Sequence, residues 1–344
     1  MDSSADYKTS VFPAFEPHRV FSSGHAMTIA AVYWPRTFAL PRAEDRFFRV
    51  DPWSQILGHC HWQTGKSIDA PVIVIVHGLE GSSDSGYMRG IGEKAFALGY
   101  HAVRLNQRNC GGTEALTPTL YNSGMSADYR AVFEELVEEG FREIFFVGYS
   151  MGGNLVLKMA GEFGVETPSQ LRGVCGVCPS LDLSACADAL ERWDNYLFEQ
   201  HFVAGLVGRF ERKRELFPDR YPEVTRKIRT VREFDDAITA PSAGFRDAED
   251  YYEQSSAKHV LGRIAVPTLV ITAEDDPFVP YVSFLAARVD KFERIRFEAP
   301  LHGGHCAFIS RRREERFWAE SRVVEFCEGV RAGNKVGRIE MKSG

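Results

Sequence analysis

Short apolar runs, each about as long as one buried strand, recur along the chain and alternate with stretches of helical spacing. The first of them, Pro-Val-Ile-Val-Ile-Val, contains no polar residue, which is typical of a strand covered on both faces. The runs span residues 71–76, 101–105, 143–147, 171–178, 268–272 and 294–297, and helical stretches at 86–98, 126–139 and 151–163 separate several of them. This alternation predicts an α/β fold with right-handed crossovers, in which helices cover both faces of a mostly parallel sheet. Ligands are then expected at the carboxyl ends of the strands.

The two ends of the chain lack this pattern. Residues 1–45 are polar and interrupted by prolines, so we expect an extended N-terminal arm. The next two runs, 45–51 and 55–62, are predicted to form an antiparallel pair of strands joined by a turn at Pro52. The tail, 333–344, is polar and basic and is expected to fray.

The alternation of strand and helix stops for more than eighty residues between Cys178 and Val266. This part of the chain is rich in helix formers and in charge, and helices are predicted at 185–199, 202–216 and 222–234. A long helical insertion between two core strands is typical of a cap over the strand ends. We therefore predict a cap at 181–262 and a core made of 46–180 and 263–332.

The amino-acid composition limits the kinds of molecule that the protein is expected to bind. A net charge of −6 and a pI near 6 argue against nucleic acid, which requires a concentrated basic face. We find no secretory leader and no apolar run of membrane-spanning length, and seven scattered cysteines fit free thiols in a reducing compartment. The expectation is a cytoplasmic protein with a small-molecule substrate and no integral membrane segment, whose oligomeric state stays open.

The segment Gly148-Tyr149-Ser150-Met151-Gly152 lies where a predicted strand ends and a predicted helix begins. The chain must turn at once there, so Ser150 is expected in a strained conformation that the two small neighbours make sterically possible. The turn would lift its hydroxyl above the sheet, beside the free N–H groups at the start of the helix. In this context the pattern Gly-x-Ser-x-Gly predicts a nucleophilic serine.

A serine hydroxyl is a weak nucleophile at neutral pH and needs a base, which in turn needs an orienting acid. Two histidines, His302 and His305, follow the last predicted strand. We favour His305, because Gly303 and Gly304 leave it on a loop that can reach back over the sheet. His302 is interpreted as a surface residue or as a support for the base.

The acid should follow the strand at 268–272, where Asp275 and Asp276 stand. Neighbouring side chains in an extended segment point to opposite sides, so only one of them should reach the histidine. We favour Asp276, just before Pro277, and expect Asp275 to bond to backbone nearby. Asp182, at the end of an earlier strand, is a further candidate. Ser150, Asp276 and His305 follow the chain order of α/β-hydrolases.

An oxyanion formed by attack of Ser150 needs two backbone donors. The N–H of Met151 follows the serine directly. The loop His77-Gly78-Leu79-Glu80-Gly81-Ser82 comes after the first long strand, where the second donor belongs, and the N–H of Leu79 is our candidate.

No cofactor and no metal are expected. Cys175 and Cys178 lie within one predicted buried strand without a second cysteine pair, so small core residues are the better interpretation. His59 and His61 would share one face of a strand but have no third ligand nearby.

With these residues in place, the chain resembles the YheT-type branch of the α/β-hydrolases, a group of serine esterases and lipid hydrolases. Beyond the triad, the resemblance rests on segments that occur in the family's order: 23–25 with 28–29, 77–82, 108–112, 121–124, 232–236 and 275–278. It implies a carboxylic ester hydrolase that uses Ser150, Asp276 and His305. Asn109 stands where family members commonly have Gly, and Asn122 where they commonly have His, and both departures would act on the pocket.

The function predicted from the sequence is that of a serine carboxylesterase that forms an acyl-enzyme on Ser150. Acyl transfer to an alcohol is the alternative, because it uses the same residues and differs in whether the cap excludes water. A non-catalytic binding module with the same fold is the third interpretation. Phe198, Phe202, Phe278 and Phe308 are candidates for the wall of an acyl pocket or for plain core.

Overall fold

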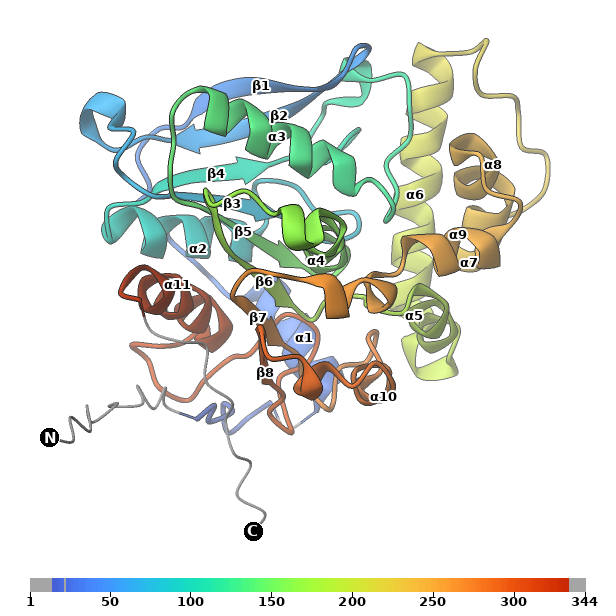
Figure 1. Cartoon of the computed structure of the whole chain (residues 1–344). Coiled ribbons are helices and arrows are strands. Elements are labelled where there is room, and N and C mark those ends of the chain that lie inside the picture. The colour runs from blue at the N-terminus through green and yellow to red at the C-terminus, as the bar shows by residue number, and fades with distance from the viewer. Residues whose placement is uncertain (1–13, 22, 334–344) are drawn as a thin grey trace, which may run out of the picture.

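A single eight-stranded sheet forms the centre of the protein in the computed structural model, which describes residues 14–21 and 23–333 (Figure 1). Its strand order is β1-β2-β4-β3-β5-β6-β7-β8. The strands are β1 (Glu44–Asp51), β2 (Ser54–His61), β3 (Val72–Val76), β4 (His101–Leu105), β5 (Ile144–Tyr149), β6 (Leu171–Val177), β7 (Thr268–Ile271) and β8 (Ile295–Glu298). From β4 to β8 all neighbours are parallel, while β2 pairs antiparallel with both β1 and β4.

Helices cover both faces of the sheet, as the alternation in the sequence predicts (Figure 1). Side chains alternate along each strand, so that Val72, Val74 and Val76 of β3 face one core and Ile73 and Ile75 face the other. The first core is closed by α3 (Ser126–Glu138) and α4 (Met151–Phe163), the second by α2 (Gly86–Ala97) and α11 (Trp318–Arg331). The α/β-hydrolase fold class is thereby confirmed.

The helices between β6 and β7 gather at one end of the sheet, on the right in Figure 1. They are α5 (Leu183–Leu190), α6 (Tyr196–Leu216), α7 (Val231–Phe234), α8 (Ala240–Ala243) and α9 (Ala248–Ser255), and they contribute much of the wall of the pocket above the strand ends. Two predictions here were wrong. Residues 196–216 form one helix without a break near 200, and most of 222–234 is not helical, since only its last turn, α7, is.

The N-terminal segment is not simply extended. A ten-residue helix, α1 (Gly24–Tyr33), lies within the predicted arm, and Ser23 caps it by accepting the N–H of Ala26 at 3.2 Å. Its Met27 is fully buried against Ala307 and Ile309 of the loop after β8. The residues against which this helix packs thus lie almost three hundred positions later in the sequence. Residues 1–13 of the predicted arm and 334–344 of the predicted tail lie outside the described residues.

A buried ion pair holds the loop after β4. The guanidinium of Arg108 donates two bonds of 2.6 Å to the carboxylate of Asp128 on α3, and its Nη1 lies 2.8 Å from Asp51. This pairing fixes the first residue of the segment 108–112, on which the family resemblance partly rests.

Within residues 14–21 and 23–333, we find no helix that combines the length and the apolar character needed to cross a lipid bilayer.

Candidate active site

Ser150 occupies a sharp turn between β5 and α4. Its φ of 53° and ψ of −119° place a non-glycine residue in a strained region, as expected for a nucleophile elbow. A Cβ on Gly148 would lie 2.0 Å from the carbonyl oxygen of Gly152, and one on Gly152 would lie 2.5 Å from the carbonyl oxygens of Val76 and His77. Both glycines are therefore required by the close approach of backbone to backbone.

This crowding predicts that Gly148→Ala destabilises the protein by about 3 kcal/mol, since backbone atoms must move to admit the methyl group. The urea midpoint of unfolding measures the effect. Gly208→Ala is the matched control, because a Cβ there would meet its nearest atom, Nη1 of Arg212, at an ordinary 3.7 Å. In the middle of α6 that change is expected to stabilise by up to about 1 kcal/mol. Equal midpoints for the two variants would contradict this account of the elbow.

His305 and Asp276 form a buried pair. Nδ1 of His305 lies 2.8 Å from Oδ2 and 3.1 Å from Oδ1 of Asp276. The Asp276 side chain is fully buried, and its Oδ1 also accepts the N–H groups of Phe278 and Val279. Burial lowers the pKa of His305, but the charge and hydrogen bond of Asp276 outweigh it, so the pKa is raised on balance. The carboxylate thus holds the ring in place and leaves Nε2 as the nitrogen available to a reacting group.

The competing candidates lie elsewhere. Asp275 contacts Nδ1 of His302 at 3.2 Å and accepts the N–H of Gly304 at 2.9 Å, which matches the local backbone role expected for it. The His302 side chain is 46% exposed, against 12% for His305. Asp182 caps α5 and contacts Nζ of Lys258 at 2.9 Å. Neither alternative acid bonds to His305.

The loop that carries His305 is held by α1, a contact that the sequence did not indicate. Thr28 accepts the backbone N–H of His305 at 2.8 Å and donates its hydroxyl to the carbonyl of Gly24 at 2.7 Å. A Cβ on Gly24 would lie 1.9 Å from the carbonyl oxygen of Asp275. The segments 23–25 and 28–29 are among those on which the family resemblance rests. In the structure they contact the loops that carry His305 and Asp275.

The two candidate oxyanion donors follow neighbouring strands of the sheet, β5 and β3. Met151 is the first residue of α4, and Leu79 follows β3; among the described residues, no hydrogen bond occupies either N–H. His77 holds the Leu79 loop, because its Nδ1–H donates to the carbonyl of Gly78 at 2.7 Å while Nε2 accepts the N–H of Gln107 at 3.1 Å. Burial lowers the pKa of His77 to about 4, which keeps the ring neutral as these two bonds require.

A mainly apolar pocket opens above Ser150. Ser150, Met151, Leu79 and His305 line it together with cap residues, among them Phe202, Leu206, Phe210 and Leu190. Of the four phenylalanines considered from the sequence, Phe202 and Phe278 are in the wall. Phe198 packs edge-on against Phe278 at 4.8 Å, and Phe308 belongs to the core on the other face of the sheet.

One carboxyl group interrupts the apolar cap wall. Asp235 begins a π-helix (Asp235–Thr239), accepts the hydroxyl of Tyr252 at 2.7 Å and is buried, which raises its pKa to about 6. Single π turns are frequent at functional sites. Asp235 lies in the segment 232–236, one of those on which the family resemblance rests.

The two departures from the family pattern both lie near the pocket. Asn109 has a φ of +66°, a conformation that Gly adopts freely and that Asn tolerates better than most residues. Its side chain donates to the carbonyl of Thr119 at 3.0 Å. Asn122 lines the pocket and accepts the N–H of Gly124.

Cys178 and Cys306 lie close to His305 and form with it a group of potential metal ligands. The potential ligand atoms of Cys178, His305 and Cys306 are all within 4.8 Å of one another. Burial raises the pKa of both thiols, and the sulfur of Cys178 accepts the N–H of Cys306 at 3.3 Å. A metal ion would have to displace two thiol protons and compete for a histidine that is already paired. We interpret these thiols as packing groups.

Solved structures share this architecture. The 2,6-dihydroxy-pseudo-oxynicotine hydrolase superimposes with a TM-score of 0.61 at 17% identity, over 92% of this chain and 74% of that one. Est1E from Butyrivibrio proteoclasticus gives 0.54 at 13% identity, over 84% and 99%. At these identities the likeness extends to the fold alone.

Sequence comparisons are more specific. A family model described as alpha/beta hydrolase fold matches residues 71–311. “Putative esterase YheT” of Escherichia coli (strain K12) is 31% identical over 327 residues, which cover 91% of this chain and 92% of that protein. “Medium-chain fatty acid ethyl ester synthase/esterase 2” of Saccharomyces cerevisiae is 28% identical over 81% of this chain and 66% of its own length. “Phospholipase ABHD3” of Mus musculus is 29% identical over 70% of this chain and 58% of its own length.

This chain therefore spans less than two thirds of the yeast and mouse proteins, but it matches the bacterial one almost end to end. It belongs to the α/β-hydrolase family, in the YheT-type branch.

Proposed function

We propose that this chain is a serine carboxylesterase that hydrolyses small-molecule acyl esters through an acyl-enzyme on Ser150. The proposal rests on one observation: a strained serine, a histidine–aspartate pair and an apolar pocket occur together. A serine on a strained strand-to-helix turn and a histidine paired with a buried carboxylate both line an apolar cavity. Relatives named as esterases support the same class of reaction.

In the proposed reaction, His305 Nε2 takes the proton of Ser150 as Oγ attacks the ester carbonyl. The N–H groups of Leu79 and Met151 stabilise the resulting oxyanion, and His305 then gives its proton to the departing alcohol. Water, activated by the same histidine, attacks the acyl-enzyme and releases the acid. Asp276 keeps the ring in the required tautomer throughout, because Nδ1–H donates to its carboxylate.

Acyl transfer to an alcohol is the second candidate, since any alcohol that reaches the acyl-enzyme can replace water. The name of the yeast relative includes both an ester synthase and an esterase. The mainly apolar cap wall favours an alcohol with a hydrocarbon part over water at this position.

A panel of acyl esters from short to long chains tests the proposal. Saturable hydrolysis is expected, together with stoichiometric labelling of one serine by a fluorophosphonate probe. Adding ethanol and separating the products decides between the two reactions, because free acid indicates hydrolysis and ethyl ester indicates transfer. The absence of turnover on every ester and of labelling would instead favour a non-catalytic binding module.

A further inference from the structure

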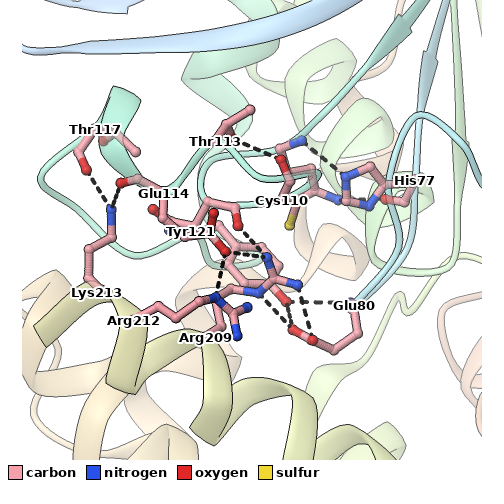
Figure 2. Close-up of polar contacts among 12 residues, drawn as sticks. His77, Glu80, Cys110, Thr113, Glu114, Thr117, Tyr121, Arg209, Arg212 and Lys213 are labelled. Atoms are coloured by element: carbon pink, nitrogen blue, oxygen red, sulfur yellow. Dashed lines mark hydrogen bonds and ion pairs between the residues drawn. The ribbon is translucent and has the colours of Figure 1, made fainter. Parts of the chain in front are cut away.

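A buried polar cluster joins cap helix α6 to the loop that carries the candidate oxyanion donor Leu79 (Figure 2). Its centre is an ion pair between Arg209 of α6 and Glu80, the residue after Leu79. Nε and Nη2 of Arg209 each lie 3.1 Å from a different carboxylate oxygen of Glu80, so the pair is bidentate. The side chains are only 9% and 12% exposed, which excludes most of the screening by water.

Tyr121 also forms hydrogen bonds with Glu80. Its hydroxyl donates to Oε1 of Glu80 at 2.7 Å and accepts the backbone N–H of the same residue at 3.4 Å. Nη1 of Arg209 also donates to the carbonyl of Asn109 and lies 3.8 Å from Glu114. Both the side chain and the amide of Glu80 are thus bound, and the charged partner comes from the cap.

The backbone at this point needs such support. Glu80 has a φ of +56°, a left-handed conformation that non-glycine residues seldom adopt unless their surroundings impose it. A Cβ on Gly205 of α6 would lie 2.3 Å from Oε2 of Glu80, so the helix contacts the carboxylate closely. The donor N–H of Leu79 belongs to the preceding peptide group, between Gly78 and Leu79. Glu80, held by the cap, therefore acts on that donor from the next residue, through the backbone of Leu79.

We propose that Glu80 and Arg209 are positioning residues that set the Leu79 amide for oxyanion binding only while α6 lies closed on the core. This inference rests on the proposed function. Neither residue touches the reacting atoms; they act through the backbone of Leu79. Displacement of α6 would separate Arg209 from Glu80 and leave a buried carboxylate unpaired beside a left-handed residue, so the donor loop would relax. Closure of the cap and assembly of the oxyanion site are then one event.

The test compares Arg209→Met with Lys213→Met. Lys213 lies one turn further along α6 and is equally a buried cation, but its Nζ donates to the carbonyls of Glu114 and Thr117, both at 2.5 Å, and not to the Leu79 loop (Figure 2). Both changes remove one buried charge from the same helix and should lower the urea midpoint. Arg209→Met alone is expected to lower kcat on a short p-nitrophenyl ester by about 10- to 100-fold, with little change in KM, because loss of a whole oxyanion donor costs about 10²- to 10³-fold.

Two further variants separate positioning from folding. Arg209→Lys, which keeps the charge but not the bidentate fork, should recover part of the kcat lost in Arg209→Met. Glu80→Gln keeps the shape of the carboxylate without its charge, and it should lower kcat in the same sense by a smaller factor. All rates are measured well below each variant's unfolding midpoint.

An equal kcat for Arg209→Met and Lys213→Met, or a loss expressed in KM alone, would overturn the positioning role while the esterase assignment stood. No turnover and no probe labelling of the unchanged protein would overturn both.

Discussion

Ser150→Ala is expected to lower kcat for ester hydrolysis by about 10⁶-fold while leaving the fold intact, as loss of the nucleophile does in other serine hydrolases. Alanine lacks the hydroxyl that would carry the acyl group, so no acyl-enzyme can form. The fold should persist because the strain at φ 53° comes from Cβ, which both residues possess. Hydrolysis rates and the intact mass after treatment with a fluorophosphonate probe measure the effect.

Ser180→Ala is the matched control for Ser150→Ala. Ser180 lines the same pocket, and it is buried to a similar degree as the other wall residues. Unlike Ser150, Ser180 does not itself have a positive φ and does not begin a helix. The probe should therefore still add once to Ser180→Ala and not at all to Ser150→Ala. Full labelling of Ser150→Ala would rule out Ser150 as the nucleophile.

The core strands could be predicted from the local pattern of the sequence, because each of them is a short run of apolar residues. Runs such as 72–76 and 144–149 are apolar throughout, and burial on both faces of the sheet is the reason. The cap could not be predicted as well. Charged helix formers at 222–230 predicted a helix, but Pro218 precedes the segment and Pro222 begins it. Val224 and Ile228 pack against the core, while most of the other residues before Val231 are exposed.

The same distinction applies to the site. Ser150, Asp276 and His305 were selected from short motifs at strand ends, and the structure brings the last two into contact and places the first in their pocket. Thr28 and Arg209 could not be selected that way, because their roles depend on partners 277 and 129 residues away. The proposed catalytic residues thus lie in short local motifs, whereas the residues proposed to support them can be identified only from contacts between distant segments.

Asp276→Asn is expected to lower kcat by about 10⁴-fold, the loss seen when the acid of a serine–histidine–aspartate site becomes an amide. The amide nitrogen can turn toward Nδ1 of His305 and stabilise the wrong tautomer, with the proton on Nε2. A second readout follows from charge. Asp276 raises the pKa of His305, so its removal should lower that pKa. The base acts when neutral, and activity appears as pH rises through its pKa, so the acid limb of kcat/KM should move to lower pH.

Asp275→Asn is the control that makes this result decisive. Asp275 is the neighbouring carboxylate, but it contacts His302 and the N–H of Gly304 and does not contact His305. Its loss should loosen the histidine loop and lower kcat by about tenfold at most, an effect of the size typical for a supporting hydrogen bond. The acid limb should stay in place, because the charge beside Nδ1 of His305 is unchanged. A shifted limb in Asp275→Asn with an unshifted one in Asp276→Asn would reverse the assignment, and the same comparison with Asp182→Asn tests the acid at the end of β6.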